Sequence, residues 1–341
     1  MSDTAAITIA FIGAAHIHTP GFLNTLRNRA GEFHVKYIWD HDAERAERRA
    51  AEMPAATATT DLTQVLGDPD VAAVVICTET DRHEEVVLPA AAAGKHLFVE
   101  KPLGIGAKDA YAMADAIEKA CVLFQTGYFQ RGNPRHLFLK EQIQAGAFGK
   151  ITRARGSNCH SGALGGWFDT DWRWMADPAQ SGVGAFGDLG THFLDILIWL
   201  LGDVTTVTAQ LDNGTARYAG CDETGEGILR FSSGVIATLA AAWDDVANPV
   251  SLLISGTEGH AVVVNDQLYF QSKHVEGADG KEPYAGLPES KPAGLDAFLD
   301  ALAGKEATLV GVREAAYRSA VMEALYTGAN ESRWVTPEAG A

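Results

Sequence analysis

Two residue types that can move a proton share one short segment, "SGVGAFGDLGTHFLDIL" at 181–197. Its apolar spacing predicts a helix, on which Asp188 and His192 lie four residues apart on one face, with Asp195 almost on the same line. A histidine titrates near neutral pH and suits a proton acceptor, and Asp188 can orient it or hold a neighbouring hydroxyl. The segment therefore indicates acid–base chemistry. Asp195 fits two roles equally, bracing the helix or touching a substrate.

The stretch "FIGAAHIHTPG" at 11–21 lies where a dinucleotide-binding turn is expected, between an apolar run and a helical pattern. Such a turn uses glycines for its tight bend, for the approach of the pyrophosphate and for close packing of helix on strand. Gly13 keeps the bend, Ala15 adds only a methyl group at the second place, and His18 takes the third. Taken alone, this turn is weak support for a cofactor site.

Two histidines of the same turn, His16 and His18, raise the question of a metal site. Zinc sites in proteins use three or four protein ligands, and this pair comes without a third. Two histidines without a third ligand are more often solvated or packed against other side chains than bound to a metal ion. The sequence therefore predicts no bound metal.

An acidic residue, Asp40, ends the second apolar run, 22 residues beyond the third-glycine position. At that place a carboxylate accepts hydrogen bonds from the ribose hydroxyls of the adenosine, although Asp40 could instead cap the next helix. Asp42 stands close by, so the 2′-phosphate of NADP would meet like charge. The cofactor predicted is NAD rather than NADP, a preference that Arg45 could soften.

Short apolar runs alternate with helical stretches over residues 1–130, which predicts an α/β domain with a doubly wound parallel sheet. The runs are nearly continuous in Val, Ile and Phe, as expected for strands buried on both faces. Strands are expected at 5–12, 34–39, 71–77, 96–100 and 122–128.

The regular alternation of apolar runs and helical stretches does not continue over residues 131–341. One strong helix precedes a series of apolar runs from 203 onward that are joined by short Gly turns, and two helices close the chain around 293–303 and 312–328. The pattern predicts an α+β domain with a large open, mostly antiparallel sheet. We expect this domain to bind substrate and to join subunits.

The charge balance excludes two classes of partner. Lys plus Arg number 27 against 44 Asp plus Glu, a formal net charge of −17. Such a surface repels phosphate backbones and anionic lipids, so nucleic acid and membrane are poor partners. No run of 18 uninterrupted apolar residues is present.

The amino-terminal stretch and the cysteines indicate the compartment. "MSDTAAITIA" has no basic region before its apolar run and no cleavage-site pattern, so we expect a cytoplasmic protein. The cysteines are widely spaced without a C-x-x-C, and the first two lie in strand-like apolar runs. They are expected to be buried free thiols rather than disulfides or zinc ligands: Cys77, Cys121, Cys159 and Cys221.

The run "FVEKPLG" at 98–104 directly follows a predicted buried strand. It resembles the signature of the glucose-fructose oxidoreductase, inositol dehydrogenase and MocA family. The segment 181–197 is a second, independent match: it is similar to the Gly-rich stretch of that family and to the helix with the pattern D-x-G-x-H-x-x-D that follows it. Stretches at 77–83, 127–134 and 167–178 follow the same template, with Glu79 and Asp81 as departures in the first.

The resemblance implies a cofactor site and a substrate site between the two domains. It implies Lys101, Asp188 and His192 as the catalytic group, with Lys101 projecting toward the nicotinamide. The cofactor candidates are Gly13, Ala15, His16, Ile17, Asp40, Thr78, His83, Glu100, Lys101, Pro102 and Gln130. The substrate candidates add Arg131, Asn133, His160, Trp167, Trp172 and Arg173, whose aromatic faces and polar forks suit a sugar or cyclitol ring.

The function expected is NAD-dependent oxidation of a secondary alcohol in a sugar, cyclitol or related polyol. His192 is expected to take the proton while Lys101 orients the oxygen, and the reverse assignment stays open. Two alternatives remain: a glycosidase or lyase-like enzyme that oxidises the sugar transiently with retained NAD, and a regulator that senses NAD or sugar without catalysis. The resemblance also implies a homodimer or homotetramer formed through the exposed face of the second sheet.

Overall fold

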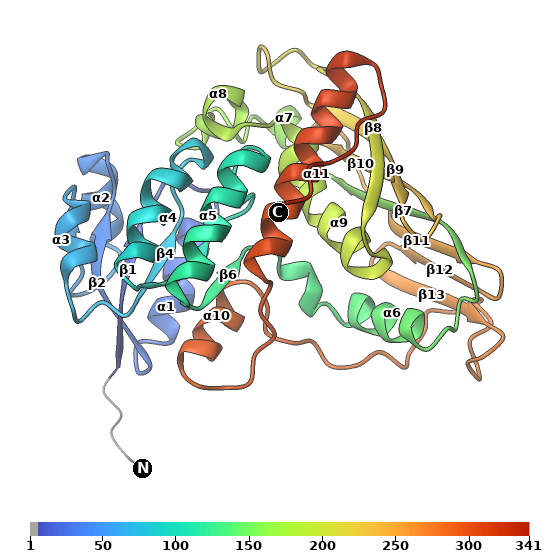
Figure 1. Ribbon diagram of the computed structural model, residues 1–341, viewed down its shortest axis with the longest axis horizontal. Helices are drawn as coiled ribbons and strands as arrows, with labels where there is room; N and C mark the ends of the chain where they lie inside the picture. The colour runs from blue at the N-terminus through green and yellow to red at the C-terminus, as the bar shows by residue number, and fades with distance from the viewer. Residues whose placement is uncertain (1–5, 341) are drawn as a thin grey trace.

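The computed structural model describes residues 6–340. Residues 1–5 and Ala341 lie outside these residues, and with them Ala5 of the first expected strand and the first half of the stretch "MSDTAAITIA". Two sheets make up the two halves of the molecule, with helix α11 (Val312–Glu331) between them (Figure 1). This helix contacts α5 (Ala107–Ala120) on one side and α9 (Ala185–Leu201) and β8 (Val204–Asp212) on the other.

The first sheet has six strands in the order β3-β2-β1-β4-β5-β6, and all neighbours pair in parallel. This order is that of a doubly wound dinucleotide-binding fold, which confirms the predicted class. Strand β3 was not predicted, because an edge strand of three residues without a large apolar side chain gives no apolar run. The strands are β1 Ile7–Ile12, β2 Phe33–Trp39, β3 Thr57–Thr59, β4 Ala73–Ile76, β5 His96–Val99 and β6 Phe124–Thr126.

Both faces of this sheet are covered, so alternate residues of a strand enter different cores. Ile9 and Phe11 pack on the side of α1 and α10, whereas Ala10 and Ile12 pack on the side of α4 and α5. Helix α10 follows the second domain in sequence and yet completes the first core. The remaining helices of this half are α1 Thr19–Asn28, α2 Ala43–Ala50, α3 Leu62–Gly67, η1 Thr80–Arg82, α4 His83–Ala92 and α10 Leu295–Leu302.

The second sheet has seven strands in the order β13-β12-β11-β7-β10-β9-β8. Only the central pair, β7 and β10, runs parallel, so the prediction of a mostly antiparallel sheet is confirmed. Besides β8, the strands are β7 Ile151–Cys159, β9 Thr224–Phe231, β10 Ile236–Ala242, β11 Val250–Gly256, β12 Gly259–Val264 and β13 Gln267–Ser272. The short helices before α9 are η2 Phe129–Gly132, α6 Pro134–Gln144, α7 Gly162–Gly165, η3 Arg173–Ala176 and α8 Pro178–Ser181.

Helix α9 crosses the inner face of the second sheet and forms the centre of its core. A side chain at Gly156 of β7 would come within 3.1 Å of Phe193, so glycine lets the helix lie close to the strand. The segment Pro178–Leu201 is long and apolar enough to cross a membrane, but 89% of its most apolar window is buried in the protein. It is a core helix that carries Asp188 and His192 to the boundary between the domains.

All four cysteines are free, as predicted, but they are not all buried. Cys77 and Cys221 are buried and Cys159 is partly buried. Cys121 is exposed, and it lies outside the strand in which it was expected to be buried. It ends helix α5 in a left-handed conformation, with φ of 53°.

Candidate active site

The two halves of the predicted catalytic group meet across the domain boundary. Lys101 follows β5 at the carboxyl edge of the first sheet, and Asp188 lies in the first turn of α9. The Lys101 ammonium Nζ donates hydrogen bonds to Asp188 Oδ1 at 2.6 Å and to the Asp188 carbonyl at 3.2 Å. The peptide bond from Lys101 to Pro102 is cis. Residues 87 positions apart in sequence therefore form one ion pair.

Asp188 is held ionised by its neighbours. Burial opposes the charge, but the ammonium of Lys101 outweighs that effect and lowers the pKa of Asp188 to about 2. The second carboxylate oxygen accepts a hydrogen bond from the indole N–H of Trp243 at 3.3 Å. The carboxylate thus stays charged at neutral pH.

His192 lies one turn after Asp188 and is 5% exposed. Burial, followed by the charge of Lys101, lowers its pKa well below 6.5. Its ring packs against those of Phe129 and Tyr128, with centroids 5.0 and 6.5 Å away. The Nδ1 atom has no hydrogen-bond partner among residues 6–340. His192 is therefore a neutral imidazole with a free nitrogen.

The turn after β1 has a backbone conformation and a close contact at Gly13 that favour glycine at this position. Gly13 has φ of +76°, and its amide donates to the carbonyl of Trp39 at 2.7 Å. A Cβ on Gly13 would lie 2.6 Å from the backbone of Thr78, so the turn and the end of β4 touch. Ala15 is buried, and its carbonyl accepts a hydrogen bond from the indole N–H of Trp174 at 3.0 Å. The second domain thereby holds the turn.

The carboxyl edge of the first sheet has the chemistry of a dinucleotide site. Helix α1 starts without a side-chain cap and without an acidic residue in its first turn, which leaves its amino terminus suited to a phosphate. Buried polar atoms without a partner in the described part of the chain lie at the same edge: Thr78 Oγ1, His83 Nε2 and Thr126 Oγ1. Burial lowers the pKa values of His83 and His16, that of His16 to about 3, so both rings are neutral.

Comparison with known proteins agrees with this geometry. Residues 7–128 match the family model described as "Oxidoreductase family, NAD-binding Rossmann fold". Residues 136–262 match the one described as "GFO/IDH/MocA C-terminal domain", and the two matches together span well over half of the chain. The chain belongs to the Gfo/Idh/MocA oxidoreductase family. Its first domain is the family's NAD-binding domain.

Relatives of this Gfo/Idh/MocA protein include sugar and cyclitol dehydrogenases. It is 29% identical to levoglucosan dehydrogenase of Pseudarthrobacter phenanthrenivorans over 76% of this chain and 74% of the relative. It is also 29% identical to scyllo-inositol 2-dehydrogenase (NAD(+)) of Bacillus subtilis over 63% and 61% of the two chains. A levoglucosan dehydrogenase solved with NADH and levoglucosan has the same fold, with a TM-score of 0.81, 22% identity, and 98% and 100% of the two chains covered.

We expect Gly13→Ala to weaken NADH binding by this Gfo/Idh/MocA chain at least about tenfold. The positive φ would cost about 1–3 kcal/mol for an alanine, and the methyl group would push the turn away from Thr78. The dissociation constant of NADH is measured by fluorescence titration. Gly94→Ala is the matched control, since Gly94 has φ of +72° and open space around it. Equal losses of affinity in both variants would contradict the expectation.

Asp40 lies at the end of β2, as predicted for the ribose ligand, but it is completely buried. Its oxygens accept hydrogen bonds from the amides of Ala14 and Asp42 and from the guanidinium of Arg45. Arg45 also pairs with Glu79 at 2.9 Å. The helix cap is Asp42, not Asp40. The guanidinium of Arg45 thus binds the same carboxylate that the sequence predicts to bind the ribose.

The predicted substrate residues fall into two groups. His160 and Trp167 pack ring on ring at 4.8 Å. Burial lowers the pKa of His160, and the charge of Asp188 lies close enough to oppose that effect, so this pair lies on the side of the catalytic group. The other group is engaged within the second domain. Arg173 lies over the ring of Tyr218, Trp172 packs against the second core, and Arg131 is bound by Asp195 and Glu314. Asn133 caps helix α6.

Asp195 braces the fold, which is one of its two predicted roles. It is completely buried and accepts hydrogen bonds from Arg131 at 2.5 and 2.9 Å and from Arg318 of α11 at 2.9 Å. The carboxylate therefore ties α9 to η2 and α11. This arrangement leaves neither Asp195 nor Arg131 directed at Lys101.

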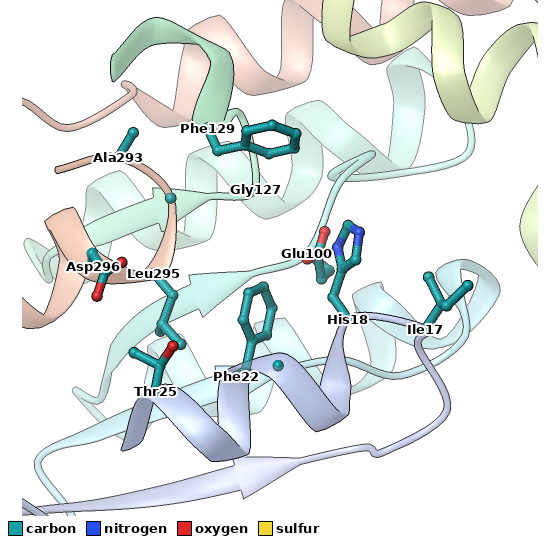
Figure 2. Close-up of a pocket in the computed structure, with 12 residues that line it drawn as sticks. Ile17, His18, Phe22, Thr25, Glu100, Gly127, Phe129, Ala293, Leu295 and Asp296 are labelled. Atoms are coloured by element: carbon teal, nitrogen blue, oxygen red, sulfur yellow. Dashed lines mark hydrogen bonds and ion pairs between the residues drawn. The ribbon is translucent and has the colours of Figure 1, made fainter. Parts of the chain in front are cut away.

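A pocket of about 460 Å³ lies between α1, the end of β5 and the start of α10 (Figure 2). Its walls include Phe22, Phe129 and Leu295, with His18 and Glu100 at one end. Lys101, Asp188 and His192 do not line it. It is nonetheless their neighbour, because Glu100 precedes Lys101 and Phe129 packs on His192.

Three aromatic residues near the site were missed by the sequence analysis as candidates. Trp243 donates to Asp188, Trp174 donates to Ala15, and Phe129 packs on His192. Trp174 and Phe129 lie within stretches that carry the family resemblance. Trp243 directly follows β10, so the only local sign of its role in the site was a tryptophan at the end of a strand.

Proposed function

We propose that this protein is an NAD-dependent dehydrogenase that oxidises a secondary alcohol of a sugar, cyclitol or related polyol. The observation that carries the proposal is the contact of Lys101 with Asp188 across the domain boundary, beside the neutral His192. A sensor of NAD or sugar has no need of such a group. The dehydrogenases among its relatives, which act on levoglucosan and scyllo-inositol, support the substrate class.

The side chains divide the work on the alcohol. NAD, when bound, supplies the acceptor of the hydride. Lys101 is paired with the carboxylate of Asp188, and its Nζ can also donate a hydrogen bond to the alcohol oxygen. His192 can accept the hydroxyl proton, because burial keeps its ring neutral. Asp188 fixes the ammonium and offsets the positive charge that His192 gains.

The preference for NAD over NADP is part of this proposal. The guanidinium of Arg45 pairs with the carboxylates of Asp40 and Glu79, and a third carboxylate, that of Asp42, accepts a hydrogen bond from the backbone amide of Arg45. A 2′-phosphate would add negative charge to a region that already has an excess of it. Arg45 would have to leave two partners in order to bind that phosphate.

The proposal is tested by screening free sugars and inositols with NAD and with NADP, following the absorbance of the reduced cofactor. We expect net NADH formation with at least one polyol and a kcat/KM for NAD at least tenfold above that for NADP. Cleavage of a glycosidic bond without net NADH would instead identify the enzyme that oxidises its substrate transiently. Binding of both ligands without any turnover would identify a sensor.

We expect the rate of alcohol oxidation to stay constant as the pH falls from 8 to about 6. His192 must be deprotonated to accept a proton, and a lowered pKa extends its neutral form toward acid pH. The measurement is kcat against pH at saturating NAD and substrate. A fall in kcat centred near 6.5 would mean that His192 has an ordinary pKa. A rise continuing above pH 8 would favour Lys101 as the proton acceptor.

The open face of the second sheet is the proposed contact between copies of the chain. Ile228 of β9 and Ile236 of β10 are 39% and 47% exposed on adjacent strands. Exposed branched apolar side chains on a wide sheet favour burial against a second copy. Light scattering is expected to show a homodimer or homotetramer.

A further inference from the structure

A cluster of possible metal ligands lies beside the catalytic group, and two of its members, His16 and Glu100, are also cofactor candidates. One ligand atom from each of His16, His18 and Glu100 lies within 4.8 Å of the others. His18 Nδ1 is 2.9 Å from Glu100 Oε1, and His16 Nδ1 is 4.0 Å from the same oxygen. Figure 2 shows His18 and Glu100 side by side at one end of the pocket.

We propose that His16, His18 and Glu100 form a site for a divalent metal ion of the zinc type. Two imidazole nitrogens and one carboxylate oxygen are a donor set that zinc uses where it keeps one coordination position open. Tetrahedral ligands about 2.0–2.2 Å from zinc lie about 3.3 Å from one another. The distances of 2.9 and 4.0 Å lie on either side of that value, and all three ligand atoms lie within 4.8 Å of one another, so the side chains must move closer together to bind the ion.

The carboxylate of Glu100 is already oriented for this role. The side chain is 1% exposed, and Oε2 accepts a hydrogen bond from the amide of Lys101 at 2.7 Å. That bond leaves Oε1 facing both imidazoles, and such outer contacts fix the direction of a metal ligand. His16 Nδ1 accepts a bond from the His18 amide at 3.2 Å, which coordination would replace.

The open position would face the pocket. His18 and Glu100 both line it, and the side chain of His18 is 37% exposed, which gives an ion a path from solvent. His16 is 3% exposed and closes the opposite side. A water molecule or an oxygen of a molecule bound in the pocket can then complete the coordination.

The sequence predicts no metal here because the third ligand is not local. Glu100 stands 82 residues after His18 and reaches it only because β5 ends beside the turn that follows β1. Because His16 and Glu100 are also cofactor candidates, the ion would lie against the cofactor site, and its binding is therefore tested on the chain without NAD. The proposal holds or fails whatever substrate the enzyme takes.

The test uses the full chain without an affinity tag, freed of metal by a chelator that is then removed by dialysis. Zn²⁺ is titrated calorimetrically, and Co²⁺ is added separately to record its visible absorption bands. We expect one ion per chain, with binding weakened at least tenfold in His18→Ala and in Glu100→Gln. His274→Ala is the matched control, because His274 forms a surface pair with Glu258 and should leave binding unchanged.

Circular dichroism and thermal unfolding establish that each variant folds. If Glu100→Gln does not fold, His18→Ala still decides the question, since it alters a partly exposed side chain. Absence of Zn²⁺ binding to the wild-type chain overturns the proposal. Binding that survives in folded His18→Ala, or that is lost in His274→Ala, overturns it as well.

Discussion

Replacing Lys101 by methionine is expected to lower kcat for alcohol oxidation about 10³-fold. The substitution removes the only lysine that contacts Asp188 in the described part of the chain, and with it the donor proposed for the alcohol oxygen. A loss of this size, about 4 kcal/mol in the barrier, is what removal of one such donor costs in a buried site. Methionine keeps most of the side-chain volume, so the core around β5 stays filled.

The readout is designed to separate chemistry from binding. The dissociation constant of NADH, measured by fluorescence titration, is expected to change less than threefold in Lys101→Met. Lys95→Met is the matched control, because Lys95 is also buried but lies at the opposite end of β5, where it donates to two backbone carbonyls. Wild-type kcat in Lys101→Met would remove the lysine from the mechanism. A parallel loss of kcat in Lys95→Met would make the effect structural.

Replacing Asp195 by asparagine is expected to destabilise the second domain by about 3 kcal/mol. The carboxylate is completely buried between Arg131 and Arg318, and the latter is only 3% exposed. Breaking a buried ion pair leaves the other charge without compensation, which costs about 3–5 kcal/mol. Glu314 remains near both guanidinium groups and keeps the loss at the lower end of that range.

Denaturant unfolding followed by tryptophan fluorescence measures this effect. Six of the seven tryptophans lie beyond residue 160, so the signal reports chiefly on the second domain. Asp115→Asn is the control, because it removes one of the two surface carboxylates that pair with Arg313 and should not change the midpoint measurably. Unchanged stability in Asp195→Asn together with a raised KM for substrate would assign Asp195 to substrate binding instead.

The sequence by itself determined both sheets and the helix that carries the acid–base residues. Strands of a parallel sheet that are buried on both faces are nearly continuous apolar runs, as in "AITIAFIG", and the helical spacing of 185–201 puts Asp188 and His192 on one face. These are local consequences of residue type. They hold whatever the rest of the chain does.

Local signals failed where the element was short or its burial depended on distant segments. The strand β3 has three residues and no large apolar side chain. Cys121 lies beside an apolar run, yet it ends a helix at the surface. Helix α10 looks like part of the second domain by position, but its Leu295 and Phe298 fill the first core.

Only the tertiary structure decided which charged groups meet. Lys101 forms an ion pair with Asp188, and Arg45 forms one with Asp40. Glu100 lies beside two histidines of the turn that follows another strand. Each contact spans the gap between elements whose packing is set by the whole core. A pattern of a few residues fixes which way a side chain points from its own element, and it carries no information on what the opposing element presents there.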